Sequence, residues 1–275
     1  MLHFEWESAD GIMLSGFRDE PEKVPDAVLC LVHGLGEHAG RYKDLSCQLC
    51  AAGIAVLSMD LRGHGTSDGK RGHVAPRSRV LEDIDDLIRK ARNAWPGRPV
   101  FLMGHSLGGN LVLHHRLAGK EKVAGTVASS PALILANPKP PAVMMLLRTA
   151  ARLLPALIIP NRLDPAGLSR NRHIAVEYRS DPLVHPYISL QAGVDMVDAG
   201  NLVLARAAEP GGPVLLLHGS ADPICSVEGS RQFARAAGDL CAYQEFEGMY
   251  HELHHESIWP EEARRIAAFV LSGGH

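Results

Sequence analysis

The stretch Gly104-His105-Ser106-Leu107-Gly108 contains a serine that can act as a nucleophile. An apolar segment, 100–103, precedes it, and a segment with the pattern of a helix, 110–118, follows it. A serine on a sharp strand-to-helix turn needs glycine on both sides, because its backbone is strained and the flanking elements approach closely. The turn also lifts the hydroxyl clear of the sheet. This context predicts that Ser106 is a nucleophile, although the bare pentapeptide occurs by chance in many proteins.

A serine hydroxyl needs a base to take its proton and a carboxylate to hold that base in the right tautomer. With a nucleophile on this kind of turn, the partners follow in the order serine, acid, histidine. Asp222 comes just after the apolar run 213–218, and His251 comes after the last strand-like run, 242–246. We therefore predict a catalytic triad of Ser106, Asp222 and His251.

Other acids and histidines fit this order less well. Asp195 and Asp198 lie outside the regular strand-and-helix pattern, and Asp239 follows a helix-like segment. His254 and His255 lie further into the turn after the last strand, and either would replace His251 if that strand ended later.

Two backbone N–H groups must also point at the oxyanion of a tetrahedral intermediate. The residue after the nucleophile, Leu107, supplies one of them. Leu35, in the glycine-rich stretch 33–36 after the apolar run 27–32, is the candidate for the other. Only the two amides take part, so the leucine side chains have no role in this oxyanion hole. The helix that begins at Leu107 adds the positive end of its dipole to the same place.

The segment 251–255, His-Glu-Leu-His-His, also matches the His-Glu-x-x-His pattern of zinc proteases. That pattern belongs in the middle of a helix, but Gly248 closely precedes it and Pro260 follows it. We therefore predict that no metal and no cofactor is bound. The other loop histidines are expected to form hydrogen bonds rather than to bind metal. They are His33, His38, His64 and His73.

Continuous apolar runs alternate with helix-like segments along most of the chain. Such runs, unlike alternating ones, are typical of strands that are buried on both faces. After an opening hairpin at 5–17, the pattern predicts an α/β fold with a mostly parallel sheet and helices on both faces. Catalytic groups in such sheets gather at the carboxyl ends of the strands, where the motifs described above lie.

The alternation stops at 131–206, where Pro, Met and Leu are dense. We predict that this segment is an inserted helical cap over a core formed by 1–130 and 207–275. A transmembrane span would need about 18 or more apolar residues without charge, and Arg148 and Arg152 interrupt the run. Two interpretations of the cap stay open, and both can hold. Its helices pack onto the core, or they form an apolar lid that meets lipid.

The composition excludes several classes of protein. A chain of 275 residues with 46% hydrophobic and 21% charged residues is typical of one large globular α/β domain. Its net charge of −3, without a basic run, argues against nucleic acid as a partner. Residues 1–7 show no signal-peptide pattern, and five irregularly spaced cysteines favour a reduced, cytoplasmic setting. Cys47 and Cys50 are expected to be buried where their helix packs.

With these motifs in place, the chain resembles the α/β-hydrolases and, more closely, the monoacylglycerol lipase family. The segments 33–42 and 63–72 resemble signature loops of that family. The cap segments are more discriminating than the triad motifs, which many hydrolases share. Further segments similar to the family are 135–138, 168–171, 178–183 and 219–225.

The resemblance implies an α/β-hydrolase fold and hydrolysis of a monoacylglycerol to fatty acid and glycerol. It also implies that the cap contacts membranes peripherally. Glu37, Arg41, His105 and Tyr178 stand where the family places polar groups around the glycerol head, although a Glu37–Arg41 ion pair and packing of Tyr178 in the cap are equally open interpretations. Cys225 is either a pocket thiol or a core residue. A lysophospholipid or a short-chain ester is the alternative substrate, and a non-catalytic binding protein is the alternative function.

Overall fold

The computed structural model describes residues 2–74, 76–209 and 211–274. Eight strands in this part of the chain form one sheet in the order β1-β2-β4-β3-β5-β6-β9-β10. The strands from β4 to β10 run parallel to one another, and β1 and β2 form the antiparallel hairpin that the sequence predicts. The strands are β1 (Leu2–Glu7), β2 (Met13–Asp19), β3 (Ala27–Val32), β4 (Ile54–Met59), β5 (Val100–His105), β6 (Thr126–Ser129), β9 (Val214–Gly219) and β10 (Cys241–Phe246).

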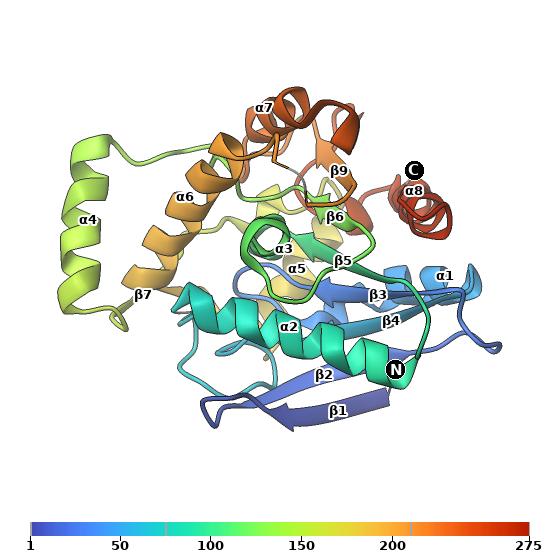
Figure 1. Ribbon diagram of the computed structural model, residues 1–275. Coiled ribbons are helices and arrows are strands. Elements are labelled where there is room, and N and C mark those ends of the chain that lie inside the picture. The colour runs from blue at the N-terminus through green and yellow to red at the C-terminus, as the bar shows by residue number, and fades with distance from the viewer. Residues whose placement is uncertain (1, 75, 210, 275) are drawn as a thin grey trace.

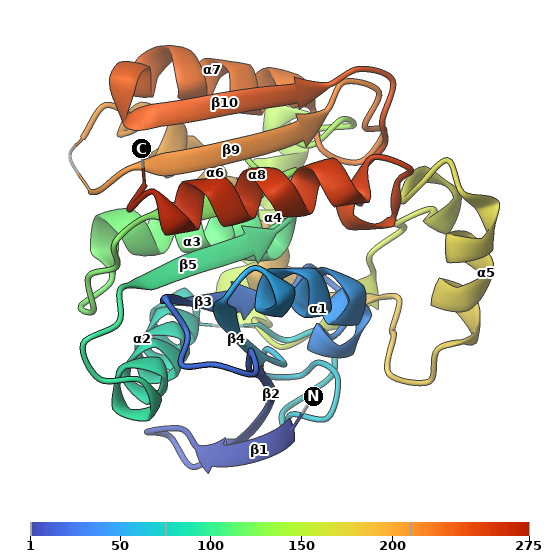
Figure 2. The same ribbon diagram turned by 90° about the vertical axis from the view of Figure 1, so that its right-hand side faces the viewer.

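Helices cover both faces of this sheet (Figures 1 and 2). In β3, Val28 and Val32 pack toward α2 and α3, whereas Leu29 and Leu31 pack toward α1 and α8. Successive side chains of a strand point to opposite faces, so an unbroken apolar run requires apolar partners on both sides. One face carries α1 (Lys43–Ala51) and α8 (Trp259–Leu271), and the other carries α2 (Arg77–Ala94), α3 (Leu107–Ala118), α6 (Leu190–Ala205) and α7 (Val227–Ala237). The predicted α/β fold is confirmed.

The loops that carry the predicted chemistry follow β3, β5, β9 and β10. In the parallel register, Val32 pairs with Gly104 on β5, and Phe246 of β10 pairs with Gly219 of β9. The carboxyl ends of these strands therefore lie along one edge of the sheet. Short 3₁₀ turns occur in the loops after two of these strands, in the loop before β10 and in the segment between β6 and β9. They are η1 (Ala39–Tyr42), η2 (Pro165–Gly167), η3 (Gly238–Leu240) and η4 (Leu253–His255).

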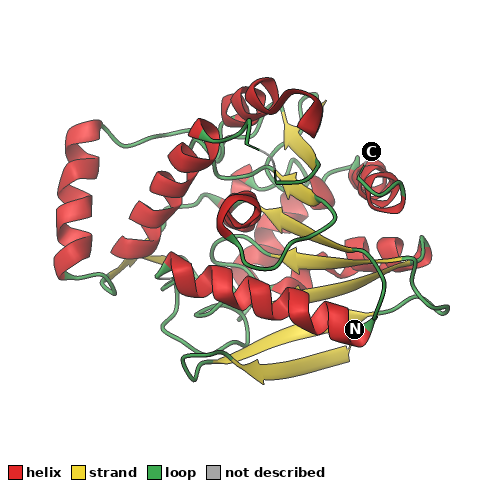
Figure 3. Cartoon of the chain, in the orientation of Figure 1, coloured by secondary structure: helices red, strands yellow, loops and turns green. Residues whose placement is uncertain are grey.

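The segment between β6 and β9 contains α4 (Pro141–Leu153), α5 (Arg172–Ser180) and α6, as well as a two-stranded antiparallel sheet of β7 (Ile158–Pro160) and β8 (Tyr187–Ser189). Its helices α4 and α6 are visible to the left of the main sheet in Figure 3. α4 packs against α6 and stands away from the core (Figure 1). The sequence predicts helices here but not the small sheet, which forms where Pro155 and Pro160 disfavour a continuing helix.

Cys47 and Cys50 lie on α1 as predicted, but the expectation that both are buried is wrong. Cys47 is exposed and Cys50 is half-buried, because the buried face of α1 is formed by Leu45, Ser46 and Leu49. Both cysteines are free thiols. None of the helices in the described residues combines the length and apolarity needed to cross a bilayer.

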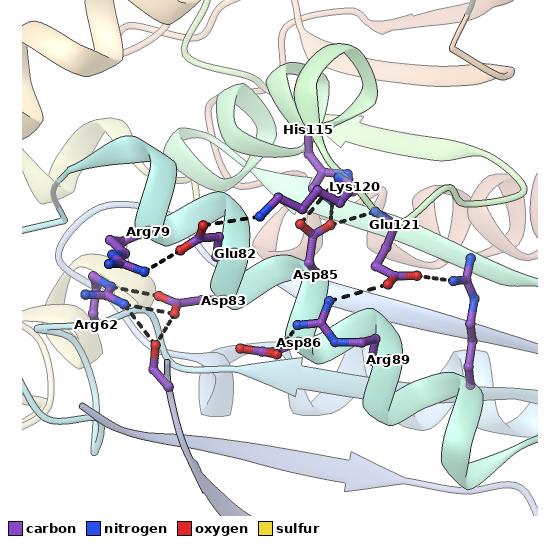
Figure 4. A network of polar contacts seen from close by, with 12 residues as sticks. Arg62, Arg79, Glu82, Asp83, Asp85, Asp86, Arg89, His115, Lys120 and Glu121 are labelled. Atoms are coloured by element: carbon purple, nitrogen blue, oxygen red, sulfur yellow. Dashed lines mark hydrogen bonds and ion pairs between the residues drawn. The ribbon is translucent and has the colours of Figure 1, made fainter. Parts of the chain in front are cut away.

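A network of charged groups connects α2 to its surroundings (Figure 4). The Arg62 guanidinium donates to Asp83 through Nε (2.7 Å) and Nη2 (2.9 Å), and Asp83 also accepts from the Ser8 hydroxyl (2.8 Å). The side chains of Arg62 and Asp83 are 3% and 0% exposed. Further along α2, Arg89 pairs with Asp86, but its side chain is 47% exposed. α2 thus carries one carboxylate, Asp83, that is paired in the interior, and others, such as Asp86, that are paired at the surface.

We expect these two pairs to differ strongly in their effect on stability. Arg62→Met leaves the Asp83 carboxylate buried without its cation, which costs about 3–5 kcal/mol. Arg89→Met breaks a solvated pair, which costs roughly 1 kcal/mol or less. Urea unfolding of both variants, compared at equal m-values, measures the difference. Equal losses of stability would contradict this account of the network.

Candidate active site

Ser106 occupies the turn between β5 and α3 with a φ of 53°. Residues other than glycine rarely adopt this left-handed region, and holding one there costs about 1–3 kcal/mol. Three backbone hydrogen bonds fix the turn. The Ser106 N–H donates to the carbonyl of Ser129 (3.0 Å), and the Ser106 carbonyl accepts from the N–H groups of Asn110 (2.9 Å) and Ala132 (3.0 Å). The strained turn predicted from the sequence is present.

Glycine is needed on both sides of Ser106 because backbones meet there. A Cβ on Gly104 would lie 2.2 Å from the carbonyl oxygen of Gly108, and one on Gly108 would lie 2.1 Å from that of Val32. Any larger residue would push α3 away from β5 or from β3. The glycines therefore set the position of Ser106 relative to the neighbouring strands.

Asp222 follows β9 and His251 follows β10, and their side chains meet. The Nδ1 atom of His251 lies 2.7 Å from Oδ2 of Asp222, and the two side chains are 2% and 0% exposed. When Nδ1–H donates to the carboxylate, Nε2 is left free to accept a proton. Ser106 and His251 line the same small recess. The structure thus brings together the three residues of the predicted triad.

The charges of this pair shift both pKa values. Burial opposes ionisation of Asp222, but the charge of His251 and hydrogen bonds from His218 and His251 hold the pKa of Asp222 below its usual range. Burial alone would lower the pKa of His251. The Asp222 carboxylate outweighs burial, with help from Glu252 and Glu37, and raises the pKa of His251 above its usual value.

The loop after β3 lies directly against the nucleophile. A Cβ on Gly34 would lie 3.2 Å from the Cβ of Ser106, and the Gly34 N–H donates to Oε1 of Glu37 (2.7 Å). Leu35 lines both the recess and a larger cavity beside Ser106. Leu107 is the first residue of α3, so no preceding helical turn supplies an acceptor for its N–H. The two predicted oxyanion-hole residues therefore flank Ser106.

Arg41 joins this loop to the turn that carries His251. Its guanidinium binds Oε2 of Glu37 (2.7 Å) and both carboxylate oxygens of Glu252 (2.6 and 2.7 Å). Oε1 of Glu37 also accepts from the Tyr42 hydroxyl (2.7 Å). Burial would raise the pKa of Glu252, but the charge of Arg41 holds it well below the usual value. The Glu37–Arg41 ion pair that the sequence left open as an alternative is present.

The other two residues that the resemblance places at the glycerol head lie nearby. Burial and His251 lower the pKa of His105 to about 4, so its ring is neutral near pH 7, and the ring centre lies 4.6 Å from that of His251. Tyr178 is buried, with its ring 4.9 Å from the Arg41 guanidinium, and its hydroxyl has no partner among the described residues. Glu37, His105 and Tyr178 line the recess, which holds about 10 Å³, whereas Arg41 lies behind it.

A larger cavity of about 410 Å³ opens from the other side of Ser106. Cys225 is buried in its wall, and burial raises the pKa of this thiol well above its usual value, so the unreactive protonated form dominates. Exposed charged residues, Lys139, Arg162 and Asp164, also line this cavity. Most of the remaining lining is apolar and includes Leu35, Ala132, Leu135, Leu163, Ile188, Met196 and Ile224.

The zinc-protease pattern does not form a zinc site of the expected kind. His251 lies outside any helix, and η4 contains only three residues. Ligand atoms of Glu252, His254 and His255 lie within 4.8 Å of one another, but both oxygens of Glu252 already bind Arg41. A metal ion there would compete with a guanidinium. His254 is instead buried against the ring of Tyr42, with a centre-to-centre distance of 4.4 Å.

The predicted loop histidines form hydrogen bonds. His33 accepts from the Leu61 N–H through Nε2 (2.9 Å) and contacts the Gly34 carbonyl through Nδ1 (2.7 Å). The other three also have polar partners. These are Asp181 for His38, the carbonyl of Arg62 for His64 and the hydroxyl of Ser189 for His73.

Sequence reasoning missed two residues that contact the predicted triad or its surroundings. His218 approaches Asp222 from β9, and Glu252 binds Arg41 across 211 positions of the chain. His218 carried a signal, because it stands four residues before Asp222 at the end of a buried strand. Glu252 carried none apart from its place beside His251.

Residues 23–258 match the model of the family described as "Serine aminopeptidase, S33". A protein of Mycolicibacterium smegmatis named monoacylglycerol lipase is 34% identical over 239 residues, which is 86% of this chain and 85% of that protein. The phospholipase YtpA of Bacillus subtilis is 28% identical and covers 90% of this chain and 95% of its own.

Solved structures agree with the sequence matches. The crystal structure of Paleococcus ferrophilus monoacylglycerol lipase superposes with a TM-score of 0.86 at 37% identity, covering 94% of this chain and 99% of its own. The fold and the relatives together identify a serine hydrolase of the lipase and esterase type. The chain belongs to the α/β-hydrolase superfamily, in the family that contains the monoacylglycerol lipases.

Proposed function

We propose that this carboxylic ester hydrolase cleaves monoacylglycerols to a free fatty acid and glycerol through an acyl-enzyme on Ser106. The observation that carries the proposal is the position of Ser106, which lies on the wall shared by a large, mostly apolar cavity and a small polar recess. An ester with an apolar chain on one side and a small polar alcohol on the other matches this division.

The mechanism follows from the hydrogen bonds of the triad. His251 Nε2 takes the proton of the Ser106 hydroxyl as the oxygen attacks the ester carbonyl, and Asp222 stabilises the imidazolium that forms. The N–H groups of Leu35 and Leu107 bind the oxyanion. His251 then protonates the departing glycerol oxygen, and the same histidine activates the water that releases the fatty acid.

The two ends of the substrate are proposed to occupy different spaces. The acyl chain lies in the large cavity, and the glycerol head faces Glu37, His105 and Tyr178. Leu163 lines both spaces, and the recess, which holds about 10 Å³, has to widen before a glycerol head can enter it. Arg41 acts through Glu37, whose carboxylate it orients.

We further propose that 131–206 is a cap that meets a lipid surface through α4. Met145, Leu146 and Leu153 on this helix are 65%, 67% and 77% exposed. The exposed Arg152 on α4 adds a cation that can contact lipid headgroups. An interfacial helix of this kind places the enzyme where a monoacylglycerol resides, without crossing the bilayer.

A lysophospholipid is the second candidate substrate. Lys139 and Arg162 line the large cavity, and neither forms an ion pair with the residues that the structure describes. Because Ser106 lines the same cavity, these two unpaired cations suit the phosphate of a lysophospholipid whose headgroup, rather than its acyl chain, enters this cavity. The similarity to a protein named phospholipase supports the same candidate.

Glycerol release from a monoacylglycerol, compared with release of the phosphorylated alcohol from a lysophosphatidylcholine of the same chain length, tests the substrate. We expect the monoacylglycerol to have the higher kcat/KM. A fluorophosphonate probe is expected to label the protein covalently, and Ser106→Ala is expected to abolish both labelling and hydrolysis. Faster turnover of the lysophospholipid would select the second candidate, and an unlabelled parent protein would favour a non-catalytic binding function.

Activity should fall on the acid side with a midpoint above about pH 6.5, the usual pKa of histidine. His251 must be neutral to accept the serine proton, and Asp222 raises its pKa, so activity is lost as the pH falls through that raised value. The pH profile of kcat/KM measures this midpoint. Glu262 on α8 is the control, because burial raises its pKa to about 7. The limb should persist in Glu262→Gln, and its disappearance would assign it to Glu262.

The double variant Leu146→Glu/Leu153→Glu should bind vesicles several-fold more weakly, because charges replace apolar side chains at the lipid contact. Hydrolysis of vesicle-borne monoacylglycerol should fall with binding, while hydrolysis of a soluble short-chain ester should not. Val24 is 72% exposed outside the cap, so Val24→Glu is the matched control. Vesicle co-sedimentation measures binding. Unchanged binding of the double variant would refute docking through α4.

A further inference from the structure

His218 contacts the oxygen of the Asp222 carboxylate that the backbone N–H groups of residues 224 and 225 do not bind. It is the penultimate residue of β9, and its side chain is fully buried. Its Nε2 lies 3.1 Å from Oδ2 of Asp222, the same oxygen that binds His251 Nδ1 at 2.7 Å. Its Nδ1 lies 2.6 Å from the hydroxyl oxygen of Ser230 on α7. Two histidines therefore meet on one carboxylate oxygen.

The partners of His218 define which nitrogen carries the hydrogen. Nε2 faces two acceptors, Oδ2 of Asp222 and the carbonyl oxygen of Cys225 (3.2 Å), so Nε2 must be a donor. In the neutral ring, Nδ1 then accepts from the Ser230 hydroxyl. The hydrogen bonds run in one direction, from Ser230 to His218 and from His218 to Asp222.

The carboxylate of Asp222 has four donors, which hold its two oxygens separately. The N–H groups of Ile224 (2.8 Å) and Cys225 (3.0 Å) bind Oδ1. The backbone therefore anchors one oxygen only, and rotation of the carboxylate plane about that anchor would move Oδ2 away from His251. His218 supplies a second fixed point at Oδ2, because the Ser230 hydroxyl on α7 holds its Nδ1 and the carbonyl of Cys225 holds its Nε2.

We propose that His218 is a positioning residue of the active site, which aims Oδ2 of Asp222 at His251 Nδ1. This inference rests on the proposed catalytic role of Ser106, Asp222 and His251. His218 itself is absent from the residues that line the cavities beside Ser106. It acts on the reaction through the carboxylate, and its loss should lower the rate of the chemical step rather than the affinity for substrate.

The chain offers a matched control in a second buried histidine–aspartate pair. His115 Nε2 lies 2.8 Å from Oδ1 of Asp85, and the side chains are 1% and 3% exposed. Figure 4 shows this pair between α2 and α3, where Asp85 also accepts from the Glu121 N–H (2.9 Å). His218→Leu and His115→Leu each remove a hydrogen bond between a buried imidazole and a buried carboxylate. Only the first touches the predicted triad.

The test compares kcat and KM for a soluble ester in the parent protein, His218→Leu, His218→Gln, Ser230→Ala and His115→Leu, with activity normalised to folded protein. We expect kcat of His218→Leu to fall roughly 10- to 100-fold, the range of a hydrogen bond to a charged group, while KM changes less than about twofold. His218→Gln should recover most of the loss, since its amide N–H can donate to Oδ2. Ser230→Ala should lose a few-fold, and His115→Leu should lose stability but keep its kcat.

A proton spectrum tests the geometry without substrate. The low-field resonance of the hydrogen between His251 Nδ1 and Asp222 should weaken in His218→Leu and return in His218→Gln. Unchanged kcat and an unchanged resonance in His218→Leu would overturn the proposal, as would equal kcat losses in His218→Leu and His115→Leu. If His218→Leu does not fold, the kcat values of His218→Gln and Ser230→Ala, each compared with that of the parent protein, test the proposal in its place. A parent protein that hydrolyses no ester would instead refute the proposed function, and the resonance would still report on His218.

Discussion

The close approach of three backbones around Ser106 is the constraint on which the rest of the site depends. The turn connects β5 to α3. These two elements pass so close to each other and to β3 that there is no room for a Cβ at positions 104 and 108, where Gly104 and Gly108 stand. The positive φ of Ser106 is a consequence of that crossing. Because the strands are buried on both faces, the packing of the core holds the strained turn in place.

The buried charged side chains near the nucleophile each have specific partners. Arg41 lies between Glu37 and Glu252, and Asp222 receives two backbone and two imidazole donors. Burying such groups costs desolvation free energy. Once their partners are fixed, however, no solvent has to reorganise around them during a reaction. The loop after β3 and the turn of His251 are thereby held together before any substrate arrives.

The fold was predictable from the sequence because its strands are continuous apolar runs with glycine or polar ends. β3 begins and ends where expected, at 27–32, and β9 and β10 each begin one residue away from the expected starts at 213 and 242. The small sheet of β7 and β8 was not predictable, because three-residue strands carry too little pattern and their pairing depends on residues far apart.

The site was predictable where chemistry imposes an order along the chain, and not where it depends on packing alone. Ser106, Asp222 and His251 follow a required order, and their meeting in space agrees with the predicted triad, whose role stays a prediction. The contact of Arg41 with Glu252 has no local signal. Likewise, the periodicity of α1 could not show that Cys47 faces water, because its apolar pattern is compatible with Cys47 either on the buried face or on the exposed face.

The pairing of β7 with β8 decides which parts of the segment between β6 and β9 can move independently of one another. It closes 161–186 into a lobe with a common base. This lobe is tied to the loops after β3 and β10 by the hydrogen bonds from the His185 N–H to the Gly36 carbonyl (2.9 Å) and from the Glu252 N–H to the Leu168 carbonyl (2.7 Å). α4 lies outside that closed lobe and packs against α6. The segment is therefore divided into a lobe that is hydrogen-bonded to the loops after β3 and β10 and a helix, α4, outside that lobe. Under the proposed docking through α4, adsorption to lipid can shift this helix without disturbing the alignment that the lobe maintains.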